Sequence, residues 1–538
     1  MFKIFISILV LIIANQSFAQ ENTVYTSLEK ALKSPGKVYQ LELTGPDLGD
    51  IPKSIATLVN LKRLRIHDSP LLDLPNEIGA LTKLEILQLE SNRITELPET
   101  IGNLAALEEI YLQKNFLLDL PESFSDLTKL RICQLDSNRI TKLTTNFGDL
   151  TSLEELSLQG NRLTKLPVNF EKLTQLKRLN LKFNDIEQLP PGFENLSNLE
   201  YLNLFQNQLR KLPENIGKLS NLSQLDLYAN RLSELPESFG NLPKLEILRL
   251  NLNYLPQLPA SFSHLPALKT LYMGSPNFNE LPESFGNLSK LEVLHIHNTS
   301  LSELPESFGK LSNLKECKLE TNALRTLPES FGDLSNLLYL YLALNKMESL
   351  PSSFGQLSKL QFVDLQENKL KGLPASFGNL SSLEVLNLRR NSLRSLPSSF
   401  GGLSSLKSIN LLYNQLENLP ESFGSLSSLE KAELGHNALL TLPQSMGGLS
   451  SLKKINLLHN QIQELPKSIG ALSNLETLQL DYNQTLQFQK AIANLSKLEQ
   501  LSLPRSIPIE DIEILKKRLP NCEIKAGFTI HQKKPSQD

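Results

Sequence analysis

The stretch Leu222–Lys244, LSQLDLYANRLSELPESFGNLPK, is one copy of a unit that repeats through most of the chain. Steps of 23 residues from Leu58 to Leu495 meet a leucine at all twenty positions. The asparagine of the unit, Asn230 in this copy, recurs at sixteen of eighteen consecutive steps. Such a regular spacing does not arise by chance, so the sequence predicts an architecture in which each copy is one structural unit.

Each part of the unit predicts a piece of backbone. Leu225 and Leu227 alternate with polar residues, which is typical of a short strand with one buried face. Stacked units would pair these strands into a parallel sheet, and the amide of Asn230 would satisfy turn backbone groups of adjacent units. Pro236 favours an extended return, and we expect Gly240 to close a turn in the left-handed conformation. No unit buries its apolar face alone, so stability must come from stacking.

The pattern L-x-x-L-x-L-x-x-N-x-L, followed by L-P-x-x-F/I-G, resembles the leucine-rich repeat in its 23-residue class. That class occurs in Ras-pathway scaffold-type proteins and in bacterial exported proteins. The resemblance covers about residues 41–505. It implies an α/β-type repeat solenoid, a leucine-rich-repeat horseshoe with one long parallel sheet on the concave face and short turns or 3-10 segments on the convex face. It also implies protein–protein interaction, although a fold does not dictate its ligand.

The first residues have the features of a secretory signal peptide. Lys3 precedes an apolar run from Ile4 to Ala14, and small residues stand before an expected cleavage site after Ala19. An uncleaved anchor helix is the alternative, but the run is shorter than the roughly 20 apolar residues that span a bilayer. We therefore expect an exported chain, periplasmic or extracellular, with no membrane span after cleavage.

Short caps are expected at both ends of the solenoid. Thr26-Ser27-Leu28-Glu29 predicts a capping box for a helix that ends near Lys33. A second helix is expected from Pro508, with Ile509, Ile512, Leu515 and Leu519 on one face, before a strand from Cys522 to Ile524. The expected segments are a signal peptide (1–19), an N-terminal cap (20–40), a solenoid of about 20 units (41–505), a C-terminal cap (506–528) and a polar tail (529–538).

Composition argues against several classes of protein. The 54 Lys and Arg residues nearly balance the 57 Asp and Glu residues, which does not fit a nucleic-acid-binding protein. Three cysteines are too few for a disulfide framework, and the cysteine-rich caps of secreted animal repeat proteins are absent, which favours a bacterial protein. The chain contains no phosphate-binding loop, nucleophile elbow or zinc-protease motif. We expect a monomer without enzymatic activity and without a cofactor.

The outward positions of the predicted strands vary from unit to unit, whereas the return segments are monotonous. Aromatic residues gather at these variable positions and at their edge, where Phe183, Tyr413 and Tyr482 lie. Tyrosine anchors interfaces well because it is amphipathic and loses little entropy on contact. The alternative is that such residues merely suit a sheet. The predicted binding residues are Tyr111, Tyr201, Phe205, Tyr228, Tyr272, His295, His297, Tyr339, Tyr341, Phe362, Arg389, Arg390 and Tyr413.

Two groups of charged or metal-ligating residues stand out on this face. Arg389 and Arg390 would contact an acidic partner, or would pair locally with Glu367 and Asp364 one unit earlier.

His295 and His297 project from one strand, and Glu320 is the register neighbour of His297. This trio could hold zinc, but it lacks a fourth ligand, and the asparagine series breaks nearby at Pro276 and Thr299. We therefore expect no metal site there.

The sequence thus predicts an exported, non-enzymatic scaffold that binds a protein or peptide on its concave sheet face. Two alternatives remain. The tyrosines could stack on sugar rings in a carbohydrate-binding envelope protein, or the chain could be a passive structural component of the surface.

Overall fold

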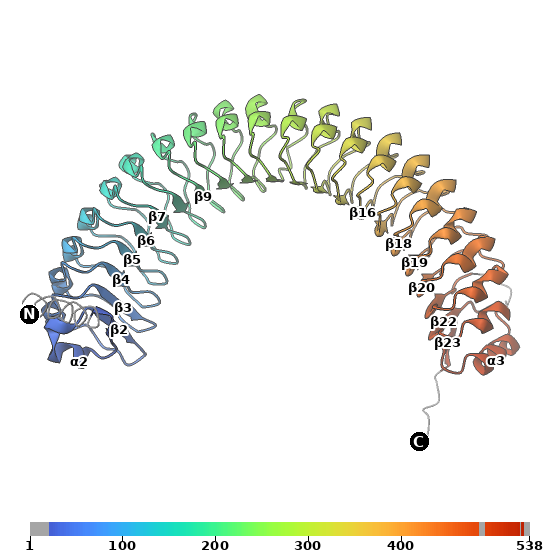
Figure 1. The fold of residues 1–538 in the computed structure, drawn as a ribbon, viewed down its shortest axis with the longest axis horizontal. Coiled ribbons are helices and arrows are strands. Elements are labelled where there is room, and N and C mark those ends of the chain that lie inside the picture. The colour runs from blue at the N-terminus through green and yellow to red at the C-terminus, as the bar shows by residue number, and fades with distance from the viewer. Residues whose placement is uncertain (1–20, 484–489, 528, 532–538) are drawn as a thin grey trace, which may run out of the picture. The chain divides into compact units, whose positions relative to one another are not determined.

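The computed structural model describes residues 21–483, 490–527 and 529–531. The chain divides into two compact units, each built from many 23-residue repeats, and from here on a unit means one of these two. The first contains residues 1–255 and 259–268, and the second contains residues 256–258 and 269–538. The expected signal peptide lies outside the described residues. Within each unit, the strands line the inner side of the curve and short 3-10 segments line the outer side (Figure 1).

Short strands, most of them of three residues, run through both units. The first unit contains β1 (Val24–Tyr25), β2 (Gln40–Thr44), β3 (Arg63–His67), β4 (Ile86–Gln88), β5 (Glu109–Tyr111), β6 (Ile132–Gln134), β7 (Glu155–Ser157), β8 (Arg178–Asn180), β9 (Tyr201–Asn203), β10 (Gln224–Asp226) and β11 (Ile247–Arg249). The second contains β12 (Thr270–Met273), β13 (Val293–Ile296), β14 (Glu316–Lys318), β15 (Tyr339–Tyr341), β16 (Phe362–Asp364), β17 (Val385–Asn387), β18 (Ser408–Asn410), β19 (Lys431–Glu433), β20 (Lys454–Asn456), β21 (Thr477–Gln479), β22 (Gln500–Leu503), β23 (Glu523–Ala526) and β24 (Thr529–His531).

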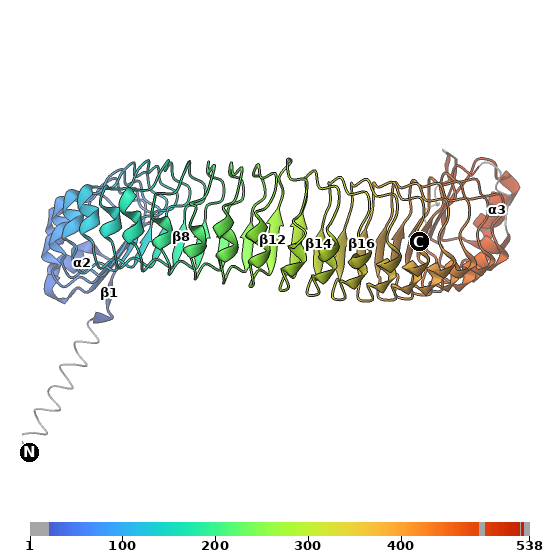
Figure 2. The same cartoon turned by 90° about the horizontal axis from the view of Figure 1, so that it is seen from above.

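The strands pair in parallel at the register of the repeat, so the predicted parallel sheet is confirmed in each unit. Leu225 lies opposite Leu202 on one side and Leu248 on the other, which are offsets of one repeat. These leucines are buried. Figure 2 shows the consecutive turns of each unit lying side by side along the stacking direction.

The repeated asparagine forms a buried ladder of hydrogen bonds, as the sequence predicts. Asn230 donates through Nδ2 to the carbonyls of Leu204 (2.9 Å) and Leu227 (3.1 Å), and its Oδ1 accepts from the backbone N–H of Leu209 (3.0 Å). Without Asn230 the N–H of Leu209 would be buried without a partner, whereas each of the two carbonyls would keep one bond, from Asn207 or from Asn253. The same set of bonds occurs at Asn115, Asn138, Asn161, Asn184, Asn207, Asn253, Asn345, Asn368, Asn391, Asn414, Asn437, Asn460 and Asn483.

Buried phenylalanines stack behind the sheet, one for each turn that carries this residue. In the second unit, Phe354 lies between Phe331 and Phe377, with ring centroids 6.5 and 5.7 Å away and the planes within 3° of parallel. All three side chains are fully buried. This stack fills the space between the strands and the 3-10 segments.

The predicted role of the glycine after this phenylalanine is wrong. Gly240 lies in η10 (Glu237–Asn241) and is not among the residues with positive φ. The next turn passes too close for a side chain, because a Cβ on Gly240 would lie 2.1 Å from the carbonyl oxygen of Ser261 in η11 (Ala260–His264). The glycine is needed for close packing between neighbouring 3-10 segments.

Gly240→Ala is therefore expected to lower the free energy of unfolding by about 1–3 kcal/mol, through overpacking of the neighbouring turn. Gly372→Ala is the matched control, because a Cβ there meets nothing within 4 Å. Urea denaturation of both variants checks this expectation. An equal loss of stability in the two would show that close packing is not the reason for the glycine.

The left-handed turn lies elsewhere, at the residue directly before the asparagine. Ala229 has φ 53° and Leu344 has φ 58°, and Gly160 holds the same position at φ 67°. Two predicted binding residues, Arg390 (φ 53°) and Tyr413 (φ 59°), occupy this position as well. This strain could not be predicted from the sequence, because side chains of many kinds occupy the position.

Glycine at a left-handed position should relieve that strain and stabilise the folded chain. Leu344 is exposed, and a residue with a Cβ costs about 1–2 kcal/mol in the left-handed region. Leu344→Gly should therefore raise the free energy of unfolding, by about 0.5–1 kcal/mol after the entropy of the unfolded glycine is counted. Thermal melts of Leu344→Gly and Leu344→Ala separate the backbone effect from the loss of the side chain, since only the glycine variant should gain.

The two caps differ in detail from the prediction. Helix α2 (Leu28–Lys33) begins after Ser27, whose hydroxyl accepts from the backbone N–H of Lys30, so Thr26 is not the capping residue. Helix α3 (Ile509–Arg518) follows Pro508 and buries Ile512 and Leu515, but Ile509 is 73% exposed because it lies in the first turn.

The last strands close the second unit. β23 runs parallel to β22 and begins one residue later than predicted, and β24 returns antiparallel to it. Among the residues that the structure describes, no helix has the length and apolar character to cross a membrane.

The cysteines behave as small apolar residues. Cys133 and Cys317 are fully buried and free, and burial raises the pKa of both thiols. Cys522 is also free, and burial raises its pKa to about 11. Thiols with raised pKa values are poor nucleophiles at neutral pH.

Candidate ligand-binding face

The outward side chains of the strands form one face in each unit, which we call the strand face. Each predicted binding residue lies on a strand or within three residues after one, and each is at least partly exposed. In the first unit these are Tyr111, Tyr201, Phe205 and Tyr228. In the second unit they are Tyr272, His295, His297, Tyr339, Tyr341, Phe362, Arg389, Arg390 and Tyr413.

A first aromatic cluster lies on the strand face beside β8, β9 and β10. Its members are Arg178, Lys182, Phe183, Tyr201, Phe205 and Tyr228. The rings of Phe183 and Phe205 meet edge to face at 5.0 Å, and Phe205 stacks on Tyr228 at 5.0 Å. Lys182 Nζ lies 5.0 Å from the ring centroid of Phe183. These contacts hold the rings in place before any partner arrives.

A second aromatic cluster lies across β12 to β16. Its members are Tyr272, His295, Glu316, Lys318, Tyr341 and Phe362. Tyr272 and His295 meet edge to face at 4.7 Å, and Tyr341 lies 4.7 Å from Phe362. Lys318 Nζ is 4.8 Å from the ring centroid of Tyr341.

Glu316 joins the polar groups of the second cluster. Its Oε1 lies 2.8 Å from Lys318 Nζ and 2.8 Å from His295 Nε2. Burial lowers the pKa of His295, so the imidazole is neutral at pH 7 and donates its Nε2 proton to the carboxylate. Burial alone would raise the pKa of Glu316, but hydrogen bonds from Lys318 and His295 bring it below its usual value. The cluster therefore carries a fixed ion pair rather than a titrating site.

The candidate zinc trio does not assemble. His295 is held by Glu316, and His297 Nδ1 lies 3.0 Å from Asn298 Nδ2. Burial raises the pKa of Glu320, which also disfavours a carboxylate ready for a cation. Among the described residues, no three His, Cys, Asp or Glu side chains are placed to hold a metal ion.

The two arginines make local contacts. Arg390 Nη1 lies 3.1 Å from Glu367 Oε1, whereas Asp364 accepts from the backbone N–H of Gln366 instead. The guanidinium carbons of Arg389 and Arg390 lie 5.4 and 5.7 Å from the ring centroid of Tyr413. The pairing with Glu367 forms, and the arginines also cover one side of a ring.

The ring of Tyr413 begins a stack of four rings, which we call the ring ladder. Its members are Tyr413, His436, His459 and Tyr482. Successive centroids are 4.2, 4.3 and 4.0 Å apart, and the planes are within 19° of parallel. All four residues occupy the left-handed position before the asparagine. Sequence reasoning placed Tyr413 and Tyr482 at the edge of the face but did not predict the stack. The signal was present, because four planar side chains follow one another at steps of 23 residues.

Family models match the chain over most of its repeats. The model described as a leucine-rich repeat region matches more than half of the chain, at residues 38–132, 121–206, 192–277 and 353–440. Models described as leucine rich repeat and as BspA type leucine rich repeat region match residues 319–370 and 397–525. No curated protein was found to match the chain.

Solved structures share the fold. The plant peptide hormone receptor RGFR1, in complex with RGF2, is 26% identical with a TM-score of 0.64, over 94% of this chain and 89% of the receptor. The Arabidopsis receptor kinase HAESA, in complex with the peptide hormone IDA and the co-receptor SERK1, is 25% identical with a TM-score of 0.59, over 92% and 83%. YopM from Yersinia enterocolitica is 24% identical with a TM-score of 0.53, over 92% and 88%, and shows similarity in fold alone.

Proposed function

The chain belongs to the leucine-rich-repeat family, and from that premise we propose that it binds a protein or peptide on its strand face. We also propose that it has no enzymatic activity of its own. The observation that carries the proposal is the aromatic cluster that each unit carries on its strand face.

The clusters suit an interface because they are ordered in advance. Phe205 and Tyr228 hold each other, and Lys318 holds Tyr341. A partner that docks on fixed rings loses less conformational entropy than one that must order them. Tyrosine and arginine, which the clusters contain, are also among the side chains that dominate binding energy at interfaces.

The same geometry favours a protein partner over a sugar. A sugar ring stacks on an open aromatic face, but in both clusters ring faces are already covered by a neighbouring ring or a cation. The exposed edges and hydroxyl groups fit the mixed apolar and polar surface of a peptide. The receptors RGFR1 and HAESA, which share the fold at 26% and 25% identity, were solved with peptide hormones and support this choice.

We further propose that the protein is exported. The charge, apolar run and small residues of positions 1–19 support export, and the absence of cysteine-rich caps supports a bacterial source. Cell fractionation with an antibody to the chain tests this. Recovery of the full-length chain, residues 1–19 included, in the cytoplasm would contradict it.

Capture of partners from the exported fraction by cross-linking tests the binding function. We expect wild type to capture a protein or peptide that the triple variant Tyr228→Ser, Tyr339→Ser, Tyr341→Ser loses, with affinity for the purified partner reduced at least about tenfold.

Tyr254→Ser is the matched control, because Tyr254 is 56% exposed and lies outside the strands and both clusters. It should capture the same partner as wild type. Capture that is equal for wild type and the triple variant would contradict binding on the strand face and would favour a passive structural role.

A further inference from the structure

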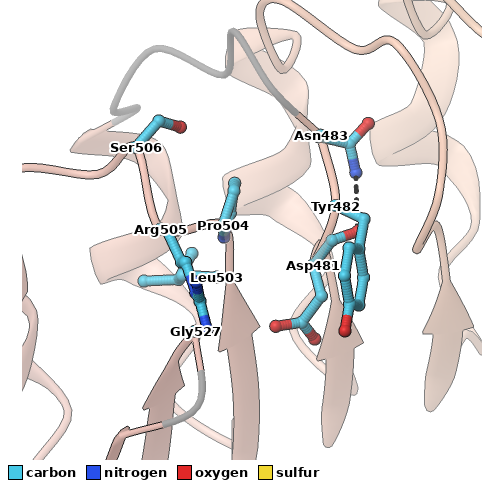
Figure 3. A pocket seen from close by; sticks show the side chains of 8 residues that line it. All are labelled: Asp481, Tyr482, Asn483, Leu503, Pro504, Arg505, Ser506 and Gly527. Atoms are coloured by element: carbon cyan, nitrogen blue, oxygen red, sulfur yellow. Dashed lines mark hydrogen bonds between the residues drawn. The ribbon is translucent and has the colours of Figure 1, made fainter.

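A cavity of about 390 Å³ opens at the end of the ring ladder in the second unit (Figure 3). It is lined by Asp481, Tyr482, Asn483, Leu503, Pro504, Arg505, Ser506 and Gly527. The repeat pattern does not predict this cavity, and none of the residues that line it belongs to the two aromatic clusters.

One wall of the cavity is the last ring of the ladder. His459 covers one side of the Tyr482 ring at 4.0 Å, with planes 7° apart. At the first rung, Arg389 and Arg390 lie over Tyr413, so that end is covered. Tyr482 instead borders the cavity and is 55% exposed. The ladder thus ends on a ring that a further flat group can extend.

The opposite wall comes from the turn after β22. One step of 23 residues from Tyr482 leads to Arg505, across the cavity, with the buried Leu503 and Pro504 beside it. The arginine stem lies against Gly527, where a Cβ would come within 2.5 Å of Arg505 Cγ. A side chain at 527 would push the arginine off this wall, and the φ of 60° there also favours glycine.

Asp481 supplies an acceptor at the edge of the cavity. Its backbone carbonyl accepts from His459, but its carboxylate has no hydrogen-bond or ion-pair partner among the residues that the structure describes. The carboxylate stands near the Tyr482 ring and on the side of Arg505 (Figure 3). A ligand between the two walls can therefore donate a hydrogen bond to it.

We propose that this cavity binds a tryptophan or tyrosine side chain of the partner, an inference that rests on the proposed peptide- or protein-binding function. The aromatic ring continues the ladder on Tyr482, and its other side faces Arg505. The indole N–H or phenol O–H donates to Asp481. Tryptophan and tyrosine are the side chains that combine a large flat ring with a donor at its edge.

N-acetyl-tryptophanamide is the direct probe, followed by saturation-transfer NMR and by its fluorescence, because this chain contains no tryptophan. Wild type should bind it, and Tyr482→Asn should bind it at least about tenfold more weakly, as the stacking ring is lost. Asparagine suits the left-handed conformation of residue 482, so the variant keeps its backbone.

Tyr413→Asn is the matched control, since it removes a ring from the other end of the same ladder at φ 59°. It should bind the probe as wild type does. Equal binding by wild type and Tyr482→Asn would overturn the proposal, as would equal losses in the two ladder variants.

The role of Asp481 is tested by comparing a probe whose ring carries an N–H donor with one whose ring carries none. Wild type should prefer N-acetyl-tryptophanamide to N-acetyl-phenylalaninamide by about tenfold, and Asp481→Ala should abolish that preference. A preference that survives in Asp481→Ala would overturn the assignment of the acceptor, and binding of methyl glucoside instead of either amide would assign the cavity to sugars.

These results are separable from the test of the strand face. If wild type captures a partner that the triple tyrosine variant loses, but does not bind the tryptophan probe, only the cavity proposal fails. If the probe binds and the triple variant still captures every partner, binding on the strand face fails while the cavity stands.

Discussion

Phe354→Ala is expected to lower the free energy of unfolding of the second unit by about 3–5 kcal/mol, the usual cost of emptying a buried aromatic site. Phe354 is fully buried between Phe331 and Phe377, so the cavity has rings on two sides and little freedom to collapse. Urea denaturation with the intrinsic fluorescence of the tyrosines measures the change.

Phe354→Met provides the control, because Met446 fills the same position in a later turn of this unit. A residue of similar volume that adapts to its surroundings should cost less than about 1.5 kcal/mol. If alanine proves no more costly than methionine, the phenylalanine stack is not a main source of stability.

The buried half of the repeat could be predicted from the sequence because each of its residues has one role that recurs. The asparagine at Asn230 is buried and bonds to the turns on both sides, and the paired leucines such as Leu225 face inward. A fixed step of 23 residues makes every copy report on the same environment. Parallel pairing at that offset follows directly.

The prediction failed where a contact depends on the neighbouring backbone rather than on the residue itself. A glycine is needed at position 240 because the carbonyl of Ser261 lies too close to leave room for a side chain. Composition does not reveal this close approach. The left-handed conformation at Tyr413 was also missed, since acidic, basic, polar, apolar and aromatic side chains all occupy that position.

The cavity at the end of the ring ladder could not be predicted from the repeat pattern. It forms where the last turn gives way to the C-terminal cap, and Gly527 directly follows β23 in that cap. Sequence periodicity predicts what recurs, so a site built at its end has to be found in the structure.

Asn230→Ala is expected to cost about 3–5 kcal/mol, a large effect for one polar side chain. The backbone N–H of Leu209 loses its acceptor in a buried turn, at about 1–3 kcal/mol, and two further hydrogen bonds of about 1 kcal/mol each disappear. Asn198→Ala is the control, because Asn198 is only partly buried and bonds to a single carbonyl, that of Thr174. Its loss should cost less than about 1 kcal/mol.

The ladder also predicts coupling between successive asparagines. The carbonyl of Leu204 accepts from both Asn207 (3.1 Å) and Asn230 (2.9 Å), so either single variant leaves it one partner. The double variant Asn207→Ala, Asn230→Ala removes both and should lose about 0.5–3 kcal/mol more than the sum of the singles. Asn207 and Asn253 share no carbonyl, so their double variant should be additive. Additivity in both pairs would mean that water replaces each asparagine independently, and that the ladder binds each turn to the next without cooperation along the stack.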